Sequence, residues 1–321
     1  MKILLTHSPE ALQLYYGERA LARLKELGEV QLHRGSSPLE GEALIQAAND
    51  CELIVSYRQS PGPARLFERL PKLKAFLRCA IDIRNVDVAA ASRAGVLVTQ
   101  ASAGFVTSVA ELVIGLLVDL SRGITRSSIE YRSGRVPKAS MGKELRGSTL
   151  GVIGYGAIGR EVVRIAKALG MRVLINDPYV KGVEQTAFDD LLRESDYVVP
   201  LALASAETEN LMNATAFSKM KKDACFINVS RGNLVDEAAL ESALDSGRLA
   251  GCAMDVGRAG DQMPTPRLAE RADVIATPHA AGLTLPAIEH QSLETVAQAA
   301  EIVKGRVPRG AVNAEHWKRK P

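Results

Sequence analysis

A glycine-rich turn between a strand and a helix constrains this chain more than any other feature. Gly154, Gly156 and Gly159 follow the apolar run 150–153 in the pattern G-x-G-x-x-G, and residues 161–170 continue with apolar positions at helical spacing. The first glycine permits a tight turn, the second lets the backbone approach a pyrophosphate, and the third lets helix and strand pack closely. The first N–H groups of such a helix then face the anion.

A second strand, predicted at 171–177, ends in Asp177, eighteen residues beyond Gly159. This is near the spacing at which an acid meets the adenosine ribose. A carboxylate there accepts hydrogen bonds from the ribose hydroxyls and repels a 2′-phosphate, so it favours NAD over NADP. The glycines alone are also compatible with a purely structural turn. Together with the two strands, the helix and the acid, they predict a dinucleotide site.

The rest of the chain predicts two α/β domains. Its 321 residues exceed one ordinary domain, and 46% of them are apolar, which suffices for two cores. Apolar strands alternate with amphipathic helices before and after the glycine turn, which favours two doubly wound parallel sheets. We expect one helix over residues 8–28, ending at Gly28, and one long helix from about 101 to 134.

Composition excludes several classes of function. The net charge is only +3, and no basic run is interleaved with aromatic residues, so nucleic acid is not implied. The four cysteines are scattered without the spacing of a metal or redox site, so no metal is expected. The most apolar stretch, 109–120, contains Glu111 and Asp119, which suits a buried helix better than a membrane span. The apolar run among the first residues is too short for a signal peptide, and we expect a cytoplasmic protein.

Three strand ends after the glycine turn carry polar residues. Arg231, Asp255 and His279 each follow an apolar run. Taken singly, an arginine there is usually a surface ion-pair partner, an acid a helix cap, and a histidine a structural residue. Together they meet the needs of hydride transfer to a 2-oxo acid: a cation for the carboxylate, a proton donor that titrates near neutral pH, and an acid that orients the nicotinamide carboxamide.

These motifs, with NVDVAAASRAGVLV, SVAELVIGLL, INVSRGNLVDEAAL and TPHAAGLT, extend over nearly the whole chain. In the identity and order of these motifs, the chain resembles the NAD-dependent D-2-hydroxyacid dehydrogenase family, whose members include phosphoglycerate dehydrogenase. The resemblance implies a Rossmann NAD-binding domain at 101–285 and a discontinuous, flavodoxin-like substrate-binding domain at 1–100 and 286–321. It also implies a small 2-oxo or 2-hydroxy acid as substrate, NAD as cofactor and a homodimer.

The resemblance also implies roles for individual residues. Arg231 binds substrate and His279 is the acid–base group, while a turn containing Ile81 and Asp82 contacts the substrate. The cofactor contacts implied by the glycine turn and by the resemblance are Gly154, Gly156, Ala157, Ile158, Gly159, Asp177, Thr208, Val229 and Asp255.

Two departures from the family pattern leave questions open. Gly260 stands where relatives have the glutamate that pairs with the histidine, and Asp261, Gln262, Asp82 or nothing replaces it. In the substrate turn, Asp82 occupies a position that is glycine in relatives; it either pairs with a nearby arginine or takes a direct role toward substrate. The main prediction is an oxidoreductase, and the alternative is an NAD(H)-binding sensor or partner-binding protein on the same fold.

Overall fold

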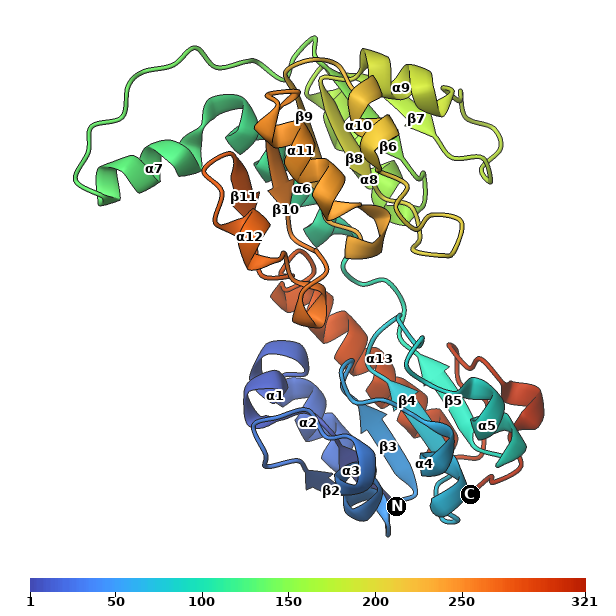
Figure 1. Ribbon diagram of the computed structural model, residues 1–321. Coiled ribbons are helices and arrows are strands. Elements are labelled where there is room, and N and C mark those ends of the chain that lie inside the picture. Colours follow the sequence, from blue (N-terminus) through green and yellow to red (C-terminus); the bar gives the residue numbers. More distant parts are fainter. The chain divides into compact units, whose positions relative to one another are not determined.

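The computed structural model describes residues 1–321, which form two compact units. Unit 1 comprises Met1–Phe105 and Leu283–Pro321, and unit 2 comprises Val106–Gly282. Each unit contains one sheet whose strands are all parallel, with helices on both faces (Figure 1). The prediction of two parallel-sheet α/β domains is confirmed.

The sheet of unit 1 has the strand order β2-β1-β3-β4-β5. Successive side chains of a strand point to opposite faces, so Ile3 and Leu5 of β1 pack into one hydrophobic core and Leu4 packs into the other. The sheet is therefore covered on both faces, as a parallel sheet requires. Its strands are β1 (Lys2–Leu5), β2 (Glu29–Leu32), β3 (Leu53–Ser56), β4 (Ala75–Arg78) and β5 (Leu97–Gln100).

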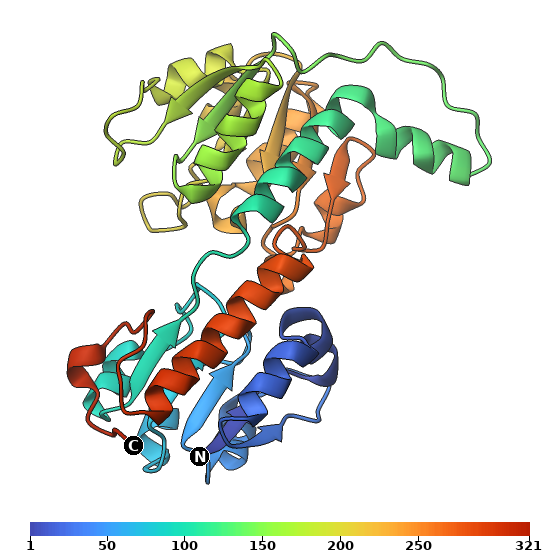
Figure 2. The same ribbon diagram turned by 180° about the vertical axis from the view of Figure 1, so that it is seen from behind.

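Two helix layers enclose this sheet. Helices α1, α2 and α13 cover one face, and α3, α4 and α5 cover the other (Figures 1 and 2). The prediction of one helix over 8–28 is wrong, because Gly17 adopts a φ of +85° and separates two helices. The helices are α1 (Pro9–Tyr15), α2 (Glu18–Lys25), α3 (Gly41–Ala48), α4 (Ala64–Arg69), α5 (Val88–Arg93) and α13 (Leu285–Val303).

The end of the chain returns to unit 1. Trp317, the only tryptophan, is buried, and its indole N–H donates to the carbonyl of Lys74 at 3.1 Å. The side chain of Asn313 accepts a hydrogen bond from the Val98 amide at 2.8 Å. These contacts complete the core beneath α13.

The sheet of unit 2 has the order β11-β10-β9-β8-β6-β7. The chain runs from β6 to β7 on one side, then returns to β8 on the other side of β6. Open sheets bind ligands beyond the carboxyl ends of their strands at such a reversal. The strands are β6 (Thr149–Ile153), β7 (Arg172–Asn176), β8 (Tyr197–Pro200), β9 (Ala224–Asn228), β10 (Leu249–Met254) and β11 (Val274–Ala276).

The long helix predicted for 101–134 is also interrupted. It begins at Val106 and breaks at Gly123, which adopts a left-handed φ of +64° between α6 and α7. No helix in the chain combines the length and apolar character that crossing a membrane requires. The remaining helices are α6 (Val106–Arg122), α7 (Ile124–Arg132), α8 (Ala157–Ala168), α9 (Phe188–Glu194), α10 (Ala214–Lys219), α11 (Glu237–Asp245) and α12 (Pro266–Ala269).

Candidate active site

The three glycines of the turn after β6 differ in what a side chain at each position would contact. Gly154 adopts a φ of +100°, and a Cβ there would lie 2.6 Å from the main chain of Leu201. A Cβ on Gly159 would lie 2.3 Å from the carbonyl oxygen of Gly154, so this glycine lets α8 pack on the turn. A Cβ on Gly156 would meet nothing within 4 Å. The open side at Gly156 is where a phosphate can approach the backbone.

The surroundings of this turn fit a dinucleotide. No side chain caps α8, which begins at Ala157 and Ile158, so its first N–H groups are available to an anion. Asp177 follows β7, and its two carboxylate oxygens accept the amides of Tyr155 at 2.7 Å and Tyr179 at 3.0 Å. Each oxygen retains a lone pair for a ribose hydroxyl.

The loops after β8 and β9 lie at the same edge of the sheet as the glycine turn. Val229 is buried directly after β9, and the hydroxyl of the next residue, Ser230, donates to the carbonyl of Ala202 after β8 at 3.0 Å. Thr208 lies in the loop after β8, and its hydroxyl donates to the carbonyl of Leu203 at 2.6 Å. The first hydrogen bond joins the two loops, and the loop after β8 packs on the glycine turn where Leu201 and Ala202 approach Gly154.

Arg231 lies just beyond β9 and is held there by the two residues Asn228 and Ser230. Its carbonyl accepts a hydrogen bond from the side chain of Asn228 at 3.0 Å, and its Nη1 donates to the carbonyl of Ser230 at 2.8 Å. A Cβ on Gly232 would lie 2.0 Å from the carbonyl oxygen of Gly257. The turn that carries the arginine is therefore packed against the loop after β10.

Asp255, at the end of β10, is fully buried. Its carboxylate accepts hydrogen bonds from the Thr277 hydroxyl at 2.6 Å and from the amides of Ala280 and Ala281 at 2.8 and 3.0 Å. Its carbonyl accepts the amide of His279 at 2.9 Å. The family resemblance implies only a cofactor contact for Asp255; in the structure this acid anchors the histidine loop.

His279 lies in that loop, after β11, with a left-handed φ of 53°. Its ring nitrogen Nδ1 lies 2.7 Å from the main-chain carbonyl oxygen of Asp261. The side-chain Oε1 of Gln262 is buried and accepts no hydrogen bond. Arg231, Asp255 and His279 thus follow three adjacent parallel strands at one edge of the sheet of unit 2.

Ile81 and Asp82 belong to unit 1, in the turn after β4. The Asp82 carboxylate accepts the Arg84 amide at 3.0 Å and the Arg84 guanidinium at 2.6 to 3.1 Å. The pairing with a nearby arginine that the sequence allowed is present. It raises the pKa of Arg84 through the hydrogen bond to Asp82.

Arg78, a second arginine near Asp82 in the sequence, is fully buried at the end of β4. Its Nη1 donates to the carbonyl of Tyr57 and its Nη2 to the side chain of Asn85, both at 2.5 Å. Burial lowers its pKa to about 10. Arg78 thereby ties the loop after β3 to the turn that contains Asp82. In the sequence, the sign that this arginine is buried is its position inside the apolar run AFLRCA.

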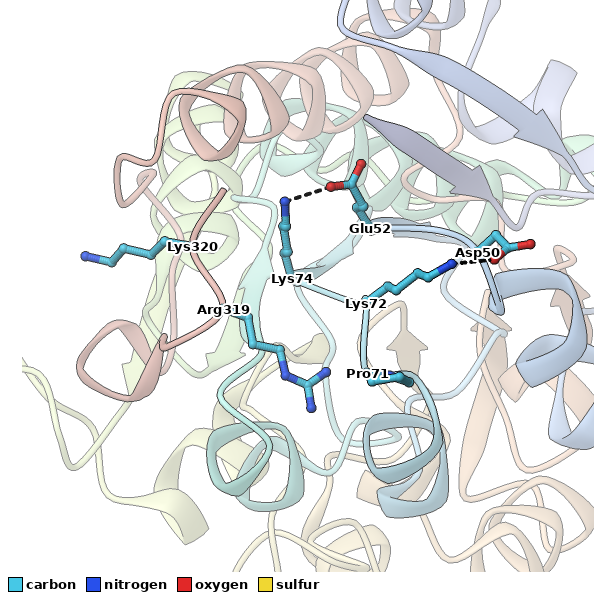
Figure 3. A pocket seen from close by; sticks show the side chains of 7 residues that line it. All are labelled: Asp50, Glu52, Pro71, Lys72, Lys74, Arg319 and Lys320. Atoms are coloured by element: carbon cyan, nitrogen blue, oxygen red, sulfur yellow. Dashed lines mark hydrogen bonds and ion pairs between the residues drawn. The ribbon is translucent and has the colours of Figure 1, made fainter.

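A cavity of about 310 Å³ lies at the amino ends of β3 and β4, the edge of the unit 1 sheet opposite this turn (Figure 3). Two of its cations are paired with carboxylates: Lys72 binds Asp50 at 2.8 Å and Lys74 binds Glu52 at 2.7 Å. Arg319 donates to the main-chain carbonyls of Leu70 and Leu73. None of the predicted site residues lines this cavity.

Residues 114–281, just over half of the chain, match the family model described as D-isomer specific 2-hydroxyacid dehydrogenase, NAD binding domain. The chain belongs to this dehydrogenase family. The dehydrogenase is similar to a glyoxylate reductase of Korarchaeum cryptofilum, with 31% identity over 95% of each chain.

It is also 34% identical to a D-3-phosphoglycerate dehydrogenase of Archaeoglobus fulgidus, over 92% of this chain but only 57% of that one. The dehydrogenase therefore spans about half the length of the phosphoglycerate dehydrogenases that it matches. Among solved structures, the apo-structure of D-lactate dehydrogenase from Escherichia coli superimposes with a TM-score of 0.83 at 28% identity, over 97% of this chain and all of the other.

Membership decides the class of reaction. The dehydrogenase is an NAD-dependent oxidoreductase that interconverts 2-hydroxy and 2-oxo acids. The residues of the glycine turn fit the cofactor, and the comparisons do not favour the alternative of a sensor on the same fold.

Proposed function

We propose that this dehydrogenase reduces a small 2-oxo acid, with Arg231 and His279 as its catalytic residues. The proposal rests on one observation: β9 and β11 end at the same edge of the sheet of unit 2, and Arg231 and His279 follow these two strand ends. The bound dinucleotide supplies or accepts the hydride. In reduction Arg231 holds the substrate carboxylate and polarises the 2-oxo group, and Nε2 of His279 gives its proton to the oxygen that becomes the hydroxyl; oxidation reverses both transfers.

The remaining site assignments belong to the same proposal. Gly156, Ala157 and Ile158 would hold the pyrophosphate, and Asp177 would bind the ribose hydroxyls. Asp255, Val229 and Thr208 contact the rest of the cofactor. Ile81 and Asp82 contact substrate from a substrate-binding domain at 1–100 and 286–321, and the cofactor domain is 101–285; the division of the chain into two compact units supports this organisation.

The similarity to a glyoxylate reductase along 95% of both chains makes glyoxylate the first substrate to test. NADH oxidation is measured with glyoxylate, hydroxypyruvate, pyruvate and phenylpyruvate. We expect turnover on at least one, and His279→Ala to lower it by about 10²–10⁴-fold, the usual contribution of an acid–base group, while NADH binding persists. Tight NADH binding without turnover on any of the four acids would instead support a sensor.

We further propose a homodimer in which a second copy covers α7. This helix buries none of its residues, and Ile124, Ile129 and Tyr131 are 51%, 54% and 64% exposed. In both views α7 projects from the body of unit 2 (Figures 1 and 2). Exposed apolar side chains gathered on one segment mark interaction sites, and the family resemblance implies a dimer.

Sedimentation tests the dimer. The wild-type protein should sediment as a dimer and Ile129→Glu as a monomer, while Arg132→Glu at the end of the same helix serves as the control. A monomeric wild type would contradict the proposal. We also propose a cytoplasmic location, because all four cysteines are buried free thiols, as is usual in reducing compartments.

A further inference from the structure

The histidine of the proposed catalytic pair has a neutral partner. Nδ1 of His279 lies 2.7 Å from the carbonyl oxygen of Asp261. A main-chain carbonyl can only accept, so the proton of the neutral imidazole resides on Nδ1. In this tautomer Nε2 carries no proton and can accept one from the substrate hydroxyl.

The conformation of the partner loop is specific. Asp261 adopts φ 54° and ψ 25°, and Gln262 adopts φ 56°. Two successive non-glycine residues in the left-handed region cost free energy and persist only where the surroundings enforce them. This backbone turns the carbonyl of Asp261 toward the ring of His279.

Hydrogen bonds and close packing fix that loop. The amide of Gly257 donates to the carbonyl of Gln262 at 2.7 Å, and the amide of Ala259 donates to the carbonyl of Met263 at 3.0 Å. A Cβ on Gly257 would lie 2.7 Å from Pro264. Its carbonyl also packs on Gly232, next to Arg231, so one rigid loop contacts the surroundings of both proposed catalytic residues.

We propose that the main-chain carbonyl of Asp261 is the positioning group that orients His279 and fixes its tautomer. Asp255 holds the backbone of the histidine loop, and the carbonyl of Asp261 sets the rotation of the ring. The role of this contact in catalysis rests on the proposed function of His279. The position of the proton on the ring does not.

The first test is ¹⁵N NMR of the histidine ring in the full chain with NADH bound. The chain has five histidines, and His279→Gln identifies the relevant signals. We expect neutral His279 to carry its proton on Nδ1 and to leave Nε2 unprotonated. A proton on Nε2 would overturn the proposal, whether or not the protein reduces any of the acids tested.

The second test separates the carbonyl from its side chain. Asp261→Asn and Asp261→Gly remove the carboxylate but tolerate a positive φ, whereas the β-branched Asp261→Val disfavours it. We expect the Asn and Gly variants to retain the tautomer. Asp261→Val should give mixed tautomers and lose about tenfold or more in kcat for glyoxylate, a part of the acid–base contribution, with NADH affinity unchanged.

A changed tautomer in Asp261→Asn would show that the carboxylate is the orienting group and overturn the proposal. If Asp261→Asn loses glyoxylate turnover while the ring signals stay unchanged, the carbonyl still orients His279. The carboxylate of Asp261 then contributes to turnover in a way that does not involve the tautomer. If Asp261→Val does not bind NADH, the ring signals of the wild type and the Asn and Gly variants decide the question. Absence of turnover in the wild type, with the proton on Nδ1, would refute the proposed function and not the positioning contact.

Discussion

The buried histidine of unit 1 makes the stability of this unit depend on pH. His7 is packed between the rings of Tyr16 and Tyr57, at centroid distances of 5.0 and 5.1 Å, and neither ring nitrogen has a hydrogen-bond partner. Burial, with a smaller contribution from the charge of Arg78, lowers its pKa from 6.5 to about 3. The folded unit therefore holds His7 neutral over a range in which the unfolded chain protonates it.

The sign and size are set by proton linkage. Between about pH 6.5 and pH 3 the unfolded state binds one more proton than the folded state, so the free energy of unfolding falls as the pH is lowered, by up to about 1.4 kcal/mol per pH unit. From about pH 7.5 to pH 5 the loss due to His7 is about 2 kcal/mol. His7→Phe retains an aromatic ring, loses no hydrogen bond, and should abolish this loss.

The measurement is urea unfolding followed by the fluorescence of Trp317, which lies in unit 1 and is the only tryptophan. Carboxylates titrate alike in both proteins, so the difference in unfolding free energy between His7→Phe and the wild type isolates His7. We expect that difference to grow by about 2 kcal/mol between pH 7.5 and pH 5. A difference that stays constant with pH would refute the claim that His7 is held neutral.

Two further substitutions test the cofactor site. Asp177→Ala should weaken NAD binding and reduce the discrimination against NADP, because the ribose acceptor and the repulsion of a 2′-phosphate are both removed; titration with the two reduced cofactors measures this, and unchanged discrimination would reject the ribose assignment. Gly159→Ala places a methyl group 2.3 Å from the Gly154 carbonyl, so the turn must shift, which should lower the stability of unit 2 by about 1–3 kcal/mol and weaken NADH binding. A variant with wild-type melting temperature and NADH affinity would contradict this packing role.

The sequence predicted features that depend on local patterns. The β6–α8 turn, the acid Asp177 and the parallel sheets each depend on residues close together in sequence, and the structure has all of them. The interruptions at Gly17 and Gly123 were missed, because a single glycine inside a helical pattern is compatible with either a continuous helix or a break. The backbone φ at each position, which the surrounding packing sets, decides between the two.

No residue pattern could have predicted the group that contacts Nδ1 of His279. From the family pattern, the missing glutamate could be replaced by Asp261, by Gln262, by Asp82 or by nothing. The geometry instead presents a carbonyl oxygen, a group that every residue carries, and its direction depends on two left-handed residues. The anchoring role of Asp255 was likewise hidden, because its donors lie more than twenty residues further along the chain.

The division of the chain into a contiguous and a discontinuous unit has a consequence for its synthesis. Residues Val106–Gly282 are contiguous, so this unit can complete its core while the ribosome is still translating residues 283–321. The discontinuous unit cannot, since Val296, Ala299 and Trp317 cover the same core as Ile3 and Leu5. Until α13 emerges from the exit tunnel, α1 and α2 alone cover this face of the nascent amino-terminal strands, and part of its apolar surface is exposed. During that interval the new chain is most exposed to aggregation and most in need of a chaperone.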